Sequence, residues 1–155
     1  MSEYDYRDSD RMDLPLARSG RGHPDVPETR SKRVLGTIYL VECSSEELLS
    51  LFDLLSGAGF GVRAFSNPFE ALEAIARSHP GIVIADVHLP EMDGLELLGR
   101  IKDVSPITRV LLTTSDPNWP AYSEVLERGA ETLIHKPIPP SVLLKLVGAT
   151  LRNDG

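Results

Sequence analysis

The chain has 155 residues, of which 41% are hydrophobic and 25% are charged, and its formal net charge is −7 at pH 7. This length allows one globular domain with a real core but is too short for two ordinary enzyme domains. The acidic balance argues against a general nucleic-acid-binding surface, which needs clustered Lys and Arg. The sequence has no apolar run of about 18 residues, no secretory signal and a single cysteine, so we expect a cytoplasmic protein without membrane insertion.

Residues 1–33 differ in composition from the rest of the chain. They hold seven acidic and seven basic side chains, and only eight apolar residues without a sustained period. Such a segment cannot repay the entropy of ordering its backbone. We therefore predict a disordered or weakly ordered N-terminal tail over residues 1–33 and a folded domain over residues 34–152. A leader without any role and a short docking segment around Leu14, Leu16 and Ala17 both stay open for the tail.

From Val34 onward, short apolar runs alternate with segments of helical periodicity, which is typical of a parallel sheet with crossover helices. The first half predicts strands over Thr37–Glu42 and Gly61–Phe65, with a helix after each strand. Ser44 and Glu47 form a capping-box pattern at the start of the first helix, and Asn67 followed by Pro68 marks the start of the second. The second strand is less continuously apolar than the first, so we expect it at an edge of the sheet.

The second half of the folded region repeats this alternation. Three further strands are predicted, over Gly81–Asp86, Arg109–Thr113 and Thr132–His135. A helix begins at Asp93-Gly94, a weaker one runs from Ala121 through Leu126 and ends at Gly129, and the last runs from Ser141 to Leu151. The pattern predicts five consecutive strand and helix units, with right-handed crossovers.

Polar side chains stand at the carboxyl ends of the predicted strands, where loops of an open parallel sheet face a crevice. Four of them have matching chemistry, namely Glu42, Asp86, Thr113 and Lys136. Two neighbouring carboxylates favour Mg²⁺, and a carboxylate is also a nucleophile toward phosphorus. A hydroxyl and an ammonium are suited to phosphoryl oxygens. The residues therefore indicate a site that handles a phosphoryl group.

The segment GIVIADVHLPEMDGLELL, from Gly81 to Leu98, resembles the signature of the receiver domains of two-component response regulators. In that signature a strand ends at the phospho-accepting Asp and continues into a Pro-x-x-Asp-Gly turn. The intervals of 27 residues from Asp86 to Thr113 and of 23 residues from Thr113 to Lys136 agree as well. The resemblance implies an α/β, flavodoxin-like (βα)5 doubly wound fold, whose five-stranded parallel sheet has the order 2-1-3-4-5.

The resemblance also implies roles for individual residues. Asp86 would accept the phosphoryl group, Thr113 would be the switch hydroxyl, and Lys136 would supply the ammonium. The Mg²⁺ ligands would be Glu42, Asp86 and the backbone carbonyl of His88.

Two positions, Cys43 and Leu133, differ from the receiver pattern, and a third, Trp119, lies outside that pattern. Cys43 occupies the place of the second of two adjacent acids, and a soft thiol is poorly matched to Mg²⁺, although Glu42 has a longer reach than Asp. Leu133 stands where receivers mostly have Tyr or Phe, and leucine cannot give the ring rotation that accompanies the switch hydroxyl. Trp119 is expected to cover the sheet edge or the start of the fourth helix, with partner docking as the alternative.

We therefore expect a phosphorelay receiver that takes a phosphoryl group on Asp86 from a sensor histidine kinase or a phosphotransfer protein. It would signal to a downstream protein by direct contact, without a fused output domain and without direct nucleic-acid binding. The alternative is a degenerate receiver that acts as a phosphorylation-independent adaptor, which Cys43 and Leu133 favour. We do not expect a conventional enzyme, beyond self-phosphorylation and a possible autodephosphorylation. A dehalogenase-type hydrolase needs an Asp at the position of His88. A Gly-rich phosphate-binding loop is also missing after the first strand.

Overall fold

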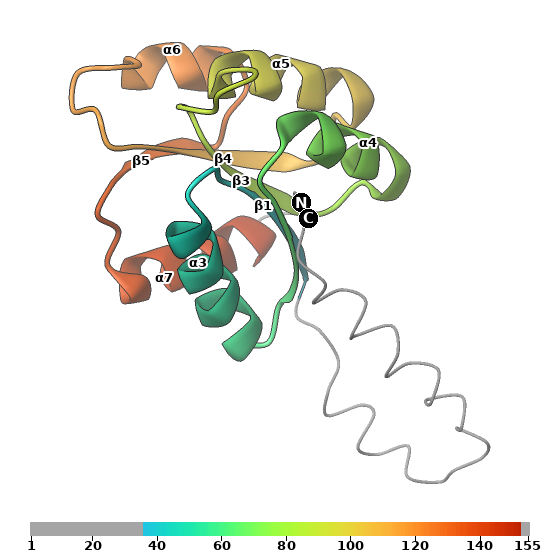
Figure 1. Ribbon diagram of the computed structural model, residues 1–155, viewed down its shortest axis with the longest axis vertical. Helices are drawn as coiled ribbons and strands as arrows, with labels where there is room; N and C mark the ends of the chain where they lie inside the picture. The colour runs from blue at the N-terminus through green and yellow to red at the C-terminus, as the bar shows by residue number, and fades with distance from the viewer. Residues whose placement is uncertain (1–35, 153–155) are drawn as a thin grey trace, which may run out of the picture.

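The computed structural model describes residues 36–152, and the tail predicted over residues 1–33 lies outside the described residues. Strands and helices alternate along the whole described region (Figure 1). In chain order the elements are β1 (Thr37–Val41), α3 (Ser45–Gly57), β2 (Gly61–Phe65), α4 (Pro68–Ser78), β3 (Ile82–Asp86), α5 (Gly94–Val104), β4 (Arg109–Thr114), α6 (Tyr122–Glu127), β5 (Thr132–His135) and α7 (Pro140–Arg152).

The five strands form one parallel sheet in the order β2-β1-β3-β4-β5, which confirms the expected fold and strand order. The strand β2 lies at an edge, as its weaker apolar pattern predicted. The strand β3 lies at the centre and all five of its residues are buried. Helices α4, α5 and α6 cover one face of the sheet, and α3 and α7 cover the other (Figure 1).

Two apolar layers hold the helices to the sheet, because successive residues of a strand face opposite sides. In β1, Ile38 and Leu40 pack in the layer with α3 and α7, whereas Tyr39 and Val41 pack in the layer with α4, α5 and α6. Full burial of one such aliphatic side chain contributes about 1.5–3 kcal/mol. A strand slipped by one residue would exchange the two layers, so the register of the sheet is strongly specified.

Side-chain caps set the start of three helices close to the carboxyl ends of the strands. The side-chain oxygen of Ser44 accepts the Glu47 N–H, and that of Asp93 accepts the Glu96 N–H at 2.9 Å. Asn67 accepts two backbone N–H groups at the start of α4. The capping box at α3 is only half made, because the backbone N–H of Ser44 points to the Glu42 carboxylate at 3.4 Å and not to Glu47. The side chain of Glu47 is thereby available to another partner.

Helix boundaries differ from the sequence-based expectation at two places. The last helix begins at Pro140, one residue before Ser141, since proline is well suited to a first helical position. The weak helix is short, from Tyr122 to Glu127, and has no side-chain cap at Ala121. The lack of a capping side chain explains why the sequence signal for this helix was poor.

Gly94 permits a close approach between the start of α5 and the loop that follows β3. A Cβ atom added at Gly94 would lie 2.5 Å from the Cα atom of Val87 and 2.9 Å from the carbonyl oxygen of Asp86. The Gly94 N–H also donates to the Val87 carbonyl at 2.8 Å. The absence of a side chain at this position therefore fixes how the loop leaves Asp86.

We predict that Gly94→Ala lowers the free energy of unfolding by about 1–3 kcal/mol, because the backbone of the loop must move away from the new methyl group. Urea denaturation measures this change. Gly99→Ala in the same helix is the matched control: an added Cβ there meets nothing within 4 Å, so this change should leave stability equal or raise it by up to about 1 kcal/mol. Equal stability of the Gly94→Ala variant and the wild type would contradict the packing described here.

Candidate functional site

The predicted site residues meet at the carboxyl edge of the sheet. Asp86 is the last residue of β3, Glu42 follows β1 directly, and Lys136 follows β5. Thr113 lies in β4 opposite Asp86 in the strand register. The structure thus brings together side chains that are as far apart in the sequence as Glu42 and Lys136.

The alternation of the strands decides which face of the sheet carries the site. Ile84 of β3 packs in the layer with α3 and α7, and Asp86 lies two residues further along the same strand. Leu111 and Thr113 stand in the same relation on β4. Residues two apart face the same side of a sheet. The site therefore shares its face with helix α3, whose first turn carries Glu47.

Lys136 is the centre of the site's charge pairing. Its Nζ atom donates to Asp86 Oδ2 at 2.6 Å, to Glu47 Oε1 at 2.6 Å and to Glu42 Oε1 at 3.1 Å. The exposed fractions of the side chains are 15% for Lys136, 8% for Asp86, 4% for Glu42 and 49% for Glu47. Three carboxylates therefore surround one ammonium, and two of the three are almost fully buried.

Sequence reasoning missed Glu47 as a member of this group. Its spacing from Ser44 assigned it to a capping box, but its carboxylate reaches Lys136 instead. The capping-box motif marks where a helix begins, but it does not show in which direction a glutamate of the first turn extends its carboxylate. The available signal was the position of Glu47 in the turn that directly follows Glu42, on a helix that had to cover the sheet.

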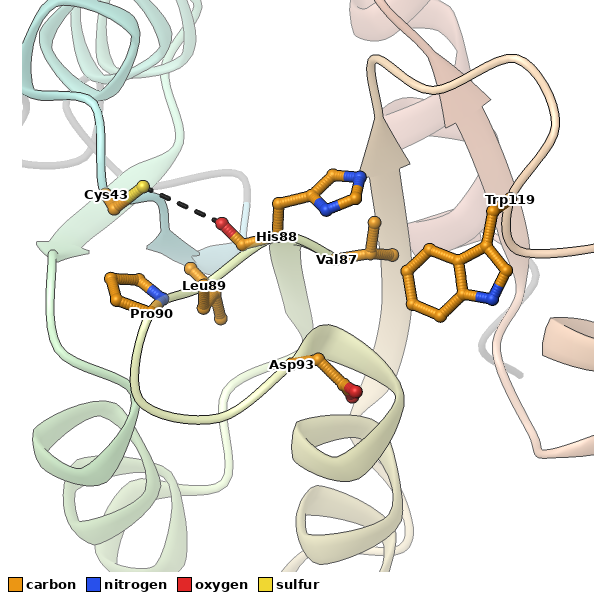
Figure 2. A pocket seen from close by; sticks show the side chains of 7 residues that line it. All are labelled: Cys43, Val87, His88, Leu89, Pro90, Asp93 and Trp119. Atoms are coloured by element: carbon orange, nitrogen blue, oxygen red, sulfur yellow. Dashed lines mark hydrogen bonds between the residues drawn. The ribbon is translucent and has the colours of Figure 1, made fainter.

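The second oxygen of Asp86 is held by the backbone. Asp86 Oδ1 accepts the His88 N–H at 2.8 Å, which orients the carboxylate. The carbonyl oxygen of His88 in turn faces the Cys43 thiol, whose Sγ atom lies 3.7 Å away (Figure 2). The His88 side chain is exposed, and its ring lies 5.6 Å from that of Trp119. Only backbone atoms of His88 thus lie next to Asp86, and its imidazole belongs to the outer surface.

The loop after β4 closes over Thr114. Its hydroxyl donates to the Trp119 carbonyl at 3.1 Å and accepts the Asp116 N–H at 3.0 Å. These bonds place Trp119 beside a hollow of about 410 Å³ next to the loop after β3. The lining residues of this hollow are Cys43, Val87, His88, Leu89, Pro90, Asp93 and Trp119 (Figure 2). Trp119 thus lies beside the loop that follows β3.

The electrostatics of the site show an excess of negative charge. Burial raises the pKa of Glu42 to about 7, and the neighbouring charge of Asp86 adds to the effect. Burial alone lowers the pKa of Lys136, but its hydrogen bonds to Asp86 and Glu47 outweigh this and leave that pKa raised. Lys136 therefore stays charged, and one ammonium does not balance the three carboxylates.

The two departures from the receiver pattern differ in their surroundings. Cys43 is exposed, and partial burial together with the charges of Glu42 and Asp86 raises the pKa of its thiol, so that sulfur stays protonated at neutral pH. Leu133 of β5 is buried in the layer with α4, α5 and α6. Cys43 thus adds no charge to the site, and Leu133 takes a packing position.

Comparisons with known proteins agree with this geometry. The family model for the response regulator receiver domain matches residues 38–148. The transcriptional regulatory protein FixJ of Bradyrhizobium diazoefficiens is 32% identical over 118 residues, which are 76% of this chain and 58% of FixJ. The phosphoglycerate transport system transcriptional regulatory protein PgtA of Salmonella typhimurium is 31% identical over 117 residues, which are 76% of this chain and 28% of PgtA. This chain thus spans less than two thirds of the length of either relative.

A solved structure shows the same fold. The crystal structure of a response regulator receiver domain protein from Clostridium thermocellum has a TM-score of 0.73 and 22% identity, and the match covers 77% of this chain and 96% of that one. Among residues 36–152, no helix has the length and apolar character needed to cross a membrane. From the family match over most of the described region, together with the strand order, we conclude that this chain belongs to the receiver domains of two-component response regulators.

Proposed function

We propose that this receiver domain accepts a phosphoryl group on Asp86. The observation that carries the proposal is the 2.6 Å contact between Lys136 Nζ and Asp86 Oδ2 at a largely buried site on the carboxyl edge of the sheet. Burying a carboxylate costs free energy unless its charge is paired, and Lys136 supplies that pairing here. Receiver domains interact with histidine kinases or phosphotransfer proteins, so the proposed donor is a phosphohistidine of one of these.

The proposed transfer is a displacement at phosphorus. A carboxylate oxygen of Asp86 attacks the phosphorus atom, the phosphorus–nitrogen bond of the phosphoimidazole breaks, and its electron pair stays on the ring nitrogen. Lys136 stands close enough to pair with an oxygen of the transferred group. Thr113, opposite Asp86 in the register, is the proposed donor of a hydrogen bond to the same group.

The donor set suits the Mg²⁺ that binds at the acidic pocket of receiver domains. Glu42 and Asp86 offer carboxylate oxygens, and we propose the His88 carbonyl as a third oxygen. Hard oxygen ligands and uncompensated negative charge are what Mg²⁺ requires. When bound, the cation would neutralise charge on the carboxylates and on the phosphoryl oxygens. Within this proposal the domain is a signalling receiver and not a conventional enzyme.

Phosphorylation would act by shifting the balance between two conformations. The proposed change is a new partner for Lys136, which exchanges carboxylate contacts for a phosphoryl oxygen. Leu133 fills a core position on β5, so the readout would not use a rotating ring there. The downstream partner is proposed to be a protein.

The adaptor alternative has its own supporting observations. Cys43 adds no carboxylate, and Leu133 is locked in the core. A receiver with these features could present a constant surface to its partner. Whether Asp86 is phosphorylated separates the two functions.

Incubation with acetyl phosphate and millimolar Mg²⁺ should add the mass of one phosphoryl group, since the pocket supplies both nucleophile and countercharge. Intact-mass spectrometry measures it, and Asp86→Asn should abolish it. Asp93→Asn is the matched control: it changes a nearby exposed Asp, and asparagine also caps helices well, so labelling should persist. A wild-type protein that stays unmodified would leave the adaptor function in place.

A second prediction concerns pH. The pKa of Glu42 is about 7 in the folded protein and 4.5 ordinarily, so between these values the folded state binds more protons than the unfolded state. Without divalent cations, the contribution of Glu42 to stability should therefore be highest below pH 4.5 and fall as pH rises through about 7, by an amount on the order of 3 kcal/mol.

Urea denaturation at pH 5.5 and pH 8 with a chelator checks this, with Glu42→Gln as the comparison. The variant should lose less stability than the wild type between the two pH values. Added Mg²⁺ should stabilise the wild type more at pH 8 than at pH 5.5. Parallel pH profiles for the two proteins would show that Glu42 is not the titrating group.

A further inference from the structure

Glu47 has no role in the proposed function described so far, yet it belongs to the same cluster. Carboxylate oxygens of Glu42, Glu47 and Asp86 all lie within 4.8 Å of one another. Glu47 comes from the first turn of α3, and its backbone N–H is tied to the Ser44 hydroxyl. The helix cap thus holds the backbone of Glu47 in place while its side chain is directed to the site.

The same region lacks the acid that receivers usually carry after Glu42. Cys43 stands there, and its thiol points to the carbonyl oxygen of His88 at 3.7 Å. The loop after β1 therefore supplies one carboxylate where two are usual, and α3 supplies one that the sequence pattern assigned to a cap.

We propose that Glu47 is a ligand of the divalent cation and replaces the carboxylate that is missing at Cys43. The inference rests on the proposed function, because it concerns the same Mg²⁺ site. The inference goes beyond the proposed function because it assigns one cation ligand to helix α3, where receivers usually supply it from the loop after β1. The cation would then be held by side chains of β3, the β1 loop and α3.

The geometry permits this with a movement of side chains. Mg²⁺ binds oxygen at 2.0–2.1 Å in an octahedron, so opposite ligands of one ion lie about 4.2 Å apart and adjacent ones about 3 Å apart. From their present 4.8 Å limit, the carboxylate oxygens need to close by up to about 2 Å. Glu42 and Asp86 are buried and fixed, whereas the side chain of Glu47 is half exposed and is the one able to adjust.

The charges favour the same arrangement. In the present structure the Lys136 ammonium occupies the place where the three carboxylates converge. A dication in their midst would balance the carboxylates and release Lys136 to pair with the phosphoryl group. If Glu47 only held Lys136 in place, its removal would leave cation affinity unchanged or increase it, because Lys136 competes for the same oxygens.

Isothermal titration with MgCl₂ on the full chain, with fluorescence of the single Trp119 as a second readout, tests the proposal. Glu47→Gln should weaken Mg²⁺ binding about tenfold, since ligand charge sets affinity at such sites. Glu46→Gln is the matched control, because Glu46 is an exposed acid in the same turn and outside the cluster, and it should change affinity less than twofold. Adding Cys43→Asp to Glu47→Gln should restore binding.

Unchanged or tighter Mg²⁺ binding by Glu47→Gln would overturn the proposal, and so would an equal loss in Glu46→Gln, which would show a general charge effect. Urea denaturation confirms that the variants are folded; the Ser44 cap uses the backbone of residue 47 and survives the substitution. If the wild type is phosphorylated on Asp86 while Glu47→Gln binds Mg²⁺ normally, only the ligand assignment fails. A wild type that neither binds Mg²⁺ nor labels Asp86 would refute the proposed function and the ligand assignment together.

Discussion

The convergence of three carboxylates on the ammonium of Lys136 is the interaction on which the rest of this site depends. Lys136 lies 2.6 Å from both Asp86 and Glu47 and 3.1 Å from Glu42. Burying carboxylates is costly, and a single ammonium offsets only part of that cost. The remaining negative charge makes the site a place for added positive charge, and it makes Lys136 the group whose partners change when a phosphoryl group arrives.

The fold holds these charged side chains close together. A parallel sheet brings the carboxyl ends of β1, β3 and β5 to one edge, and the period of two residues places Asp86 and Thr113 on the face covered by α3. The Ser44 cap starts α3 close to that edge. Gly94 lets α5 approach the loop after β3, which orients Asp86 through the His88 N–H. The apolar layers thus fix the positions of charged groups that would otherwise separate into water.

Much of this architecture could be predicted from the sequence. Apolar runs and helix caps predicted all ten elements, and the strand ends predicted that Glu42, Asp86 and Lys136 would meet. These predictions depend on local periodicity and on a general property of parallel sheets. The shortfall at Ala121, where no capping side chain marks the helix start, is likewise local.

What the sequence could not show depends on where individual side chains reach. The spacing of Ser44 and Glu47 fits a capping box, but the Ser44 N–H turns to Glu42, and Glu47 pairs with Lys136. That choice is made by a residue 89 positions away, so no local pattern contains it. The contact between the Cys43 thiol and the His88 carbonyl is equally a product of the tertiary fold.

The most direct measurement of the central claim is chemical-shift mapping of the labelled chain on addition of beryllofluoride and Mg²⁺. The account predicts that the largest changes fall on the backbone amides of His88 and Thr113 and on the Lys136 side chain, and that Asp86→Asn removes them. Shifts that spread over the surface without involving Lys136, or that persist in Asp86→Asn, would contradict it.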